Sequence, residues 1–155
     1  MKLAFAFIAA VLAPACLMTL WYLYGQFMVF EPNDPYIWVR TRGFLVICLL
    51  TSAAYVFLLG LPAYLLLRWR KAVRWWSTIS AGFILAALPV ALMSWPLRYA
   101  GMGSSSSVNG VDMMIAGVPT TAGWIQYVEG LMFFGCLGAL SGLVFWLASR
   151  SMSPN

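Results

Sequence analysis

The few charged residues of this chain are placed so that they separate four long uncharged segments. These segments are residues 3–30, 43–67, 75–97 and 130–149, with 28, 25, 23 and 20 residues. An α-helix rises about 1.5 Å per residue and the hydrocarbon core of a bilayer is about 30 Å thick, so about 20 apolar residues can cross it. Each segment reaches that length, which predicts four membrane spans.

The composition agrees with a chain that lives in lipid. Hydrophobic residues make up 63% of it and charged residues 8%, against roughly 45–50% and about 25% in soluble domains. Backbone groups must be paired inside hydrocarbon, so spans are helices or closed barrels. The apolar segments are continuous rather than alternating, which argues against a barrel. We therefore predict an all-α membrane protein, a four-transmembrane-helix bundle, as one integral domain over residues 1–155.

The predicted boundaries follow the charges and the turn-forming residues. We expect spans over about residues 3–27, 44–67, 75–96 and 127–149. These leave outer loops at residues 28–43 and 97–126, and a short cytoplasmic link at residues 68–74.

The connecting segments differ in charge from one side of the predicted bundle to the other. One side carries six basic residues and no acidic ones: Lys2, Arg68, Arg70, Lys71, Arg74 and Arg150. The other side carries Arg40, Arg42 and Arg98 together with Glu31, Asp34, Asp112 and Glu129. Because cytoplasmic loops are enriched in Lys and Arg, this asymmetry predicts that both termini are cytoplasmic. The basic link is typical of membrane topology, with binding of anionic lipid or an acidic partner as the alternative, and it gives no indication of nucleic acid.

The N-terminus also has features of a secretory signal. Lys2 precedes the apolar residues 3–13, and Ala13-Pro14-Ala15 has the small-x-small form of a cleavage site just before Cys16. Proline in that motif is unfavourable, and the apolar run continues without a charge to Phe30. We therefore expect an uncleaved first span, with processing at Cys16 as the alternative.

Three of the predicted spans contain a proline: Pro14, Pro62 and Pro89. Proline removes a backbone hydrogen bond and kinks a helix, but neighbouring helices can re-pair the freed carbonyl group. We interpret these prolines as ordinary membrane-helix features rather than as signs of a cavity.

The longest connection between predicted spans is residues 96–123, which we expect to be exposed outside the membrane. It contains Ser104–Ser107 and the turn-forming dipeptide Asn109-Gly110, followed by Val111–Ile115, which has the composition of a short strand. The serines are poor candidates for a partner strand. We expect a partly mobile loop with a small apolar patch rather than a formed sheet. We expect Met113, Met114 and Ile115 either to lie in the membrane interface or to contact another membrane or secreted protein.

The fourth predicted span is rich in small residues. Helices associate in lipid by close van der Waals approach, which small side chains permit. The sequence therefore predicts a helix-packing face at Gly135, Gly138, Ala139 and Gly142. Its partner is left open: another span of the same chain, or a second copy in a homo-oligomer.

The residues needed for most membrane chemistry are missing. The chain has no histidine, and its three cysteines, Cys16, Cys48 and Cys136, lie apart in the apolar segments. We therefore expect no metal site, cofactor or catalytic activity. Glu129 is the one ionisable residue near a span interior. With Gln126 and Arg98 it forms a candidate polar site at the outer boundary.

Two functional hypotheses follow. The first is a small interaction or accessory subunit, with an immunity-type role as one form of it. The second is an oligomeric channel or small carrier with Glu129 near its outer mouth. The short chain and the charge asymmetry favour the inner membrane of a bacterium.

Overall fold

The computed structural model describes residues 2–31, 34–71 and 73–151, and most of them are helical. Its α-helices are α1 (Lys2–Val29), α2 (Tyr36–Tyr55), α3 (Leu61–Trp69), α4 (Trp75–Met93) and α5 (Thr121–Ser151). A π-helical turn, η1 (Val56–Gly60), joins α2 to α3, and a 3-10 turn, η2 (Pro96–Tyr99), follows α4. Three strands lie between η2 and α5: β1 (Ser106–Val108), β2 (Val111–Ile115) and β3 (Val118–Pro119).

The prediction of four helices long and apolar enough to cross a membrane is confirmed. They are Leu3–Val29, Tyr36–Trp69, Trp75–Arg98 and Thr121–Arg150. Two helices begin well before their predicted spans, because charged residues end an apolar run without ending a helix. Helix α2 already begins at Tyr36, whose backbone N–H donates to the Asp34 carboxylate (2.9 Å) just after Pro35. Helix α5 begins at Thr121, immediately after the sheet.

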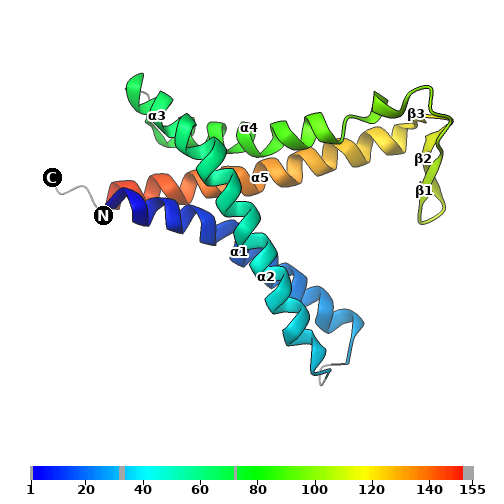
Figure 1. Cartoon of the computed structure of the whole chain (residues 1–155), viewed down its shortest axis with the longest axis horizontal. Helices are drawn as coiled ribbons and strands as arrows, with labels where there is room; N and C mark the ends of the chain where they lie inside the picture. The colour runs from blue at the N-terminus through cyan, green and yellow to red at the C-terminus, as the bar shows by residue number, and fades with distance from the viewer. Residues whose placement is uncertain (1, 32–33, 72, 152–155) are drawn as a thin grey trace.

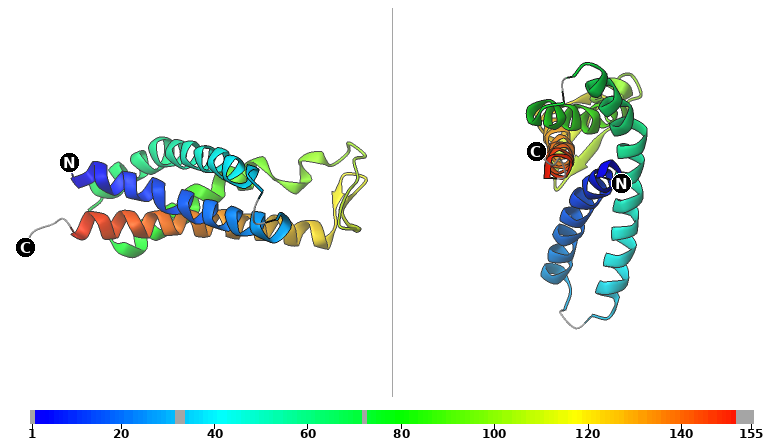
Figure 2. Two further views of the ribbon diagram at one scale, coloured as in Figure 1. Left: turned by 90° about the horizontal axis from the view of Figure 1, so that it is seen from below. Right: turned by 90° about the vertical axis from the view of Figure 1, so that its left-hand side faces the viewer.

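The helices form two hairpins that meet near one end of the molecule. Helices α4 and α5 lie antiparallel, and α1 packs against α5 and α2. Figure 1 shows the α1–α2 hairpin leaving the α4–α5 pair obliquely. The first turn of α1, the last turn of α5 and the connection from α3 to α4 lie at the same end (Figures 1 and 2).

Helices α4 and α5 approach each other closely where glycines face each other. A Cβ atom on Gly138 would overlap the carbonyl oxygen of Gly82, and one on Gly142 would overlap the carbonyl oxygen of Thr78. A Cβ on Gly135 would overlap the ring of Phe83. The predicted small face of the fourth span therefore lies against α4 of the same chain, while Ala139 beside it is half-buried.

Helix α1 runs through Pro14 without interruption, and its contact with α5 supplies the missing hydrogen bond. In a regular helix the carbonyl of Ala10 would accept from the N–H of residue 14, which proline lacks. The Ser141 hydroxyl of α5 donates to that carbonyl oxygen instead, at 2.7 Å. Ala10 is 3% exposed, so the bond is shielded from competing donors.

The buried core is small and lies near the α1–α5 contact. It consists of Ala6, Phe7, Ala10 and Phe145, with Tyr64 of α3 packed against it. The rings of Phe7, Tyr64 and Phe145 contact one another with centroids 4.9–5.9 Å apart. Most large apolar side chains on the spans face outward instead, which is favourable in lipid and unfavourable in water.

The expectation of an irregular outer loop was wrong. Residues 106–119 form a three-stranded antiparallel sheet in the order β1-β2-β3. Asn109 and Gly110 both have positive φ, at 53° and 78°, which suits a two-residue hairpin turn. The serines contribute through polar atoms: the carbonyl oxygen of Ser104 and the hydroxyl of Ser105 accept hydrogen bonds from the second turn (2.7 and 3.1 Å). Strands pair through backbone hydrogen bonds, so the serine-rich segment can form β1 without apolar side chains.

Candidate functional site

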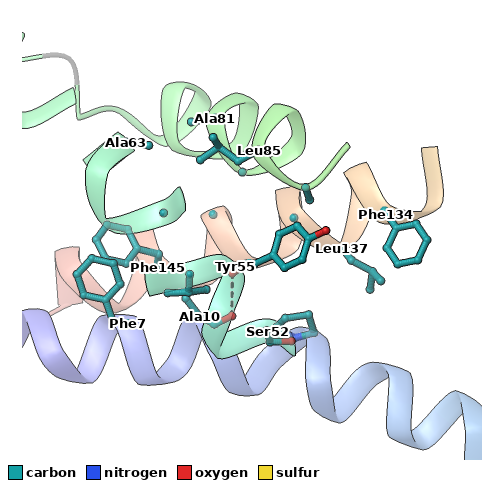
Figure 3. A pocket seen from close by; sticks show the side chains of 18 of the residues that line it. Phe7, Ala10, Ser52, Tyr55, Ala63, Ala81, Leu85, Phe134, Leu137 and Phe145 are labelled. Atoms are coloured by element: carbon teal, nitrogen blue, oxygen red, sulfur yellow. Dashed lines mark hydrogen bonds between the residues drawn. The ribbon is translucent and has the colours of Figure 1, made fainter. Parts of the chain in front are cut away.

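A cleft opens between the α2–α3 helices and the α4–α5 pair, with α1 as its floor. Its volume is about 280 Å³, and Pro14 together with the η1 residues Val56 and Gly60 lines it. Figure 3 shows Phe7 and Phe145 at one end of the cleft and Phe134 toward the other. Of the three prolines in the spans, Pro14 lines this cleft, whereas Pro62 and Pro89 are not among its lining residues.

The π-helical turn η1 is the local response of the chain to Pro62. The N–H of Leu61 reaches back five residues to the carbonyl of Val56, where an α-helix would reach back four. Proline at the next position has no N–H to continue the ladder. Such single π-turns alter which side chains a helix presents, and here the turn sits in the cleft wall.

The two long walls of the cleft differ chemically. The α4–α5 wall presents small residues, among them Gly82, Ala86 and Gly138. The opposite wall includes four residues with a hydroxyl group: Thr51, Ser52 and Tyr55 of α2, and Tyr64 of α3. The two remaining hydroxyl residues of the lining are bonded, since Thr78 donates to backbone carbonyls of its own helix and Ser141 donates to Ala10. Within the described part of the chain, the four hydroxyls on the α2–α3 wall have no hydrogen-bond partner.

Tyr55 holds the central position among these hydroxyls. It is the middle residue of the uncharged segment 43–67, with twelve residues on either side. At about 1.5 Å per residue, each flank is roughly 18 Å long, so Tyr55 lies about midway along this segment. Its ring projects from α2 into the cleft, toward Leu137 of α5 (Figure 3).

A second, more polar cavity of about 310 Å³ lies beneath the sheet. Gln126 and Tyr127 of α5 line it from one side and Met113 of β2 from another. The Tyr127 hydroxyl donates to the carbonyl of Ala91 (3.2 Å), one of the last carbonyls of α4. Trp95, Trp124 and Tyr127 form a triangle of edge-to-face rings, each pair 5.9 Å apart, which joins the outer ends of α4 and α5.

The candidate outer-boundary residues Glu129, Gln126 and Arg98 do not gather at one point. Gln126 faces the cavity beneath the sheet. The Arg98 guanidinium donates to the carbonyl of Met93 at the end of α4. Glu129 is exposed on α5, and no ion pair joins it to another residue that the structure describes.

The basic link lies between α3 and α4, at the end of the molecule opposite the sheet (Figure 1). Its four basic side chains, Arg68, Arg70, Lys71 and Arg74, are all exposed. Lys71 has a positive φ of 52°, which turns the chain back toward α4. The Ser77 hydroxyl then accepts from the Arg74 N–H (2.9 Å) and starts that helix.

Within the described residues, no three His, Cys, Asp or Glu side chains gather as a metal site would require. The cleft lining contains no ionisable carboxylate or amine. Neither the cleft nor the wall with four hydroxyl residues was predicted from the sequence, although these four residues and Pro62 all lie in the second predicted span. Comparison of the chain with protein-family models, curated proteins and solved structures finds no match.

Proposed function

We propose that this chain is a small multi-pass membrane protein that acts by binding another protein, as an interaction or accessory subunit without catalytic activity of its own. The partner is another membrane protein or a secreted protein, and immunity against a membrane-acting toxin is one form of this role. In this proposal the chain lies in a bacterial inner membrane with both termini inside, so the sheet faces outward.

The observation that carries the proposal is an apolar surface on a well-anchored sheet. Val108, Val111, Ile115 and Val118 are 43–60% exposed, although they lie in a segment outside the four spans. The sheet is anchored to α5: the Thr120 hydroxyl donates to the Asp112 carbonyl (2.7 Å) and accepts from the Gly123 N–H (3.2 Å). Exposed apolar patches mark sites of contact with a protein partner or with a membrane, and we propose a protein partner for this one.

Substitution of this surface is expected to abolish partner binding. In Ile115→Ser/Val118→Ser, two exposed apolar contacts become polar while the backbone pairing of β2 with β3 stays intact. The partner is recovered with the tagged full chain from native membranes and identified by mass spectrometry. We expect the amount recovered with the double variant to be at least about tenfold lower than with the wild-type chain. Loss of two apolar contacts of this size has that magnitude.

Ser107→Ala is the matched control, because Ser107 is exposed on β1 of the same sheet. It should leave recovery of the partner unchanged. Equal recovery with the double variant, or the absence of any stoichiometric partner, would contradict the proposal.

The competing function, an oligomeric channel or small carrier, is favoured by one observation. Glu129 is a carboxylate without an ion-pair partner among the described residues, on an exposed face of α5. We expect the purified chain in liposomes to show no ion flux above that of empty vesicles, and Glu129→Gln to change nothing. Flux that requires a defined oligomer and is lost in Glu129→Gln would replace our proposal with the channel.

The orientation can be checked by labelling. With Cys16, Cys48 and Cys136 replaced by alanine, single cysteines are introduced as Ser107→Cys in the sheet or Lys71→Cys in the basic link. A membrane-impermeant maleimide should label the first in intact cells, and the second only after the membrane is permeabilised. The opposite pattern would place the sheet in the cytoplasm.

A further inference from the structure

The intramembrane cleft goes beyond the role proposed for the outer sheet, because its chemistry indicates a small ligand. Its lining is mostly apolar, yet one wall includes four hydroxyl residues, Tyr55 among them (Figure 3), whose hydroxyl groups have no partner among the described residues. An unpaired hydroxyl in hydrocarbon is unfavourable, since no water is present to bond it. A bound molecule with a hydrogen-bond acceptor would satisfy this wall.

The depth of Tyr55 excludes the polar part of an ordinary phospholipid. The ester oxygens of a phospholipid lie at the edges of a hydrocarbon core about 30 Å thick, roughly 15 Å from the midplane. Tyr55 lies about midway along the uncharged segment 43–67, so in a bilayer that this segment spans it is close to that midplane. The acceptor must therefore belong to a molecule that lies inside the hydrocarbon core.

The ligand must also be neutral. No charged residue lines the cleft to pair with an anion or a cation. A carboxylate at this depth is strongly disfavoured without such a partner, which argues against a free fatty acid. The lining instead offers hydroxyl donors on one wall and small, flat surfaces, such as Gly82 and Gly138, on the other.

We propose that this cleft binds an isoprenoid quinone, with a quinone carbonyl oxygen accepting a hydrogen bond from the Tyr55 hydroxyl. A quinone is neutral, carries acceptors without donors, and has an apolar tail that keeps it in the hydrocarbon core. Ser52 lies three residues before Tyr55 on the same face of α2 and lines the cleft as a second donor. The rings of Phe7, Tyr64 and Phe145 close one end of the cleft. The proposal concerns binding, and no redox step is assigned to this chain.

The test uses the full chain purified in detergent and a decyl-substituted benzoquinone as the probe. Equilibrium binding and the thermal unfolding midpoint are measured for wild type, Tyr55→Phe and Tyr24→Phe. Tyr24 is the matched control, because it is an exposed tyrosine on α1 outside the cleft lining. We expect the quinone to raise the unfolding midpoint of wild type and Tyr24→Phe equally. In Tyr55→Phe its affinity should fall about tenfold, as for the loss of one buried hydrogen bond.

A decyl alcohol and a short-chain phosphatidylcholine serve as competing probes. Binding of either one as tightly as the quinone would overturn the proposal, because the cleft would then be filled by any hydrocarbon chain. An unchanged quinone affinity in Tyr55→Phe, or no quinone binding to wild type, would overturn it as well. A second variant, Ala63→Phe, places a ring in the cleft from α3 and should abolish quinone binding while the helical circular dichroism is preserved. Failure of this proposal leaves the role of the outer sheet untouched, since the partner-recovery experiment uses residues outside the cleft.

Discussion

Gly138→Ala is expected to destabilise the protein by about 1–3 kcal/mol, the range found when a methyl group is forced into a packed interior. The new Cβ atom would overlap the carbonyl oxygen of Gly82 and lie 2.5 Å from the Cβ atom of Ala86. Backbone atoms of α4 cannot turn aside as a flexible side chain does, so α4 and α5 must separate. Their close contact over Gly135, Gly138 and Gly142 would be loosened along its whole length.

The measurement is unfolding by sodium dodecyl sulfate from mild detergent, followed by circular dichroism. Gly130→Ala is the matched control on the same helix, because no atom lies within 4 Å of its added methyl group. That control should be neutral or slightly stabilising, since alanine favours helix over glycine by up to about 1 kcal/mol. Equal unfolding of the two variants would show that the glycine contact does not hold α4 against α5.

Ser141→Ala is expected to destabilise the wild-type chain by about 1–2 kcal/mol and the Pro14→Ala chain by much less. The Ser141 hydroxyl bonds the Ala10 carbonyl, which Pro14 leaves without its helical donor. In Pro14→Ala a backbone N–H returns at residue 14, so the carbonyl no longer depends on α5. This magnitude is the free-energy cost of leaving a buried carbonyl unpaired, and it is also the range reported for hydrogen bonds between membrane helices.

The same unfolding assay, applied to the two single variants and the double variant, completes the thermodynamic cycle. Ser149→Ala is the control, because the Ser149 hydroxyl bonds the Trp146 carbonyl of its own helix (2.8 Å) and not another helix. A cost of Ser141→Ala that is the same with and without Pro14 would mean that the hydroxyl does not compensate for the proline.

The four spans could be predicted because their signal is local. An apolar segment of 20 residues or more between charges is already long enough to cross a bilayer, whatever it packs against. The extra turns of α2 escaped prediction because Arg40 and Arg42 end the apolar segment, whereas the helix begins after Asp34 and Pro35.

The sheet and the cleft depend on contacts between distant residues. Ser104 and Ser105 bond a turn more than ten residues away, so their own side chains gave no sign of pairing. The cleft exists because the α1–α2 hairpin diverges from the α4–α5 pair (Figure 1). The angle between the two hairpins cannot be predicted from the sequence of any single span.

The amino-acid sequence alone determined that this chain has four helices suited to a membrane, with its charges collected at their ends, because length and hydropathy act on each segment separately. The tertiary structure decided that the glycines of α5 pack on α4, that Ser141 serves the carbonyl freed by Pro14, and that the hydroxyls of α2 face a shared cleft. Those features exist only once helices far apart in the chain are brought together, since each one needs atoms from at least two of them.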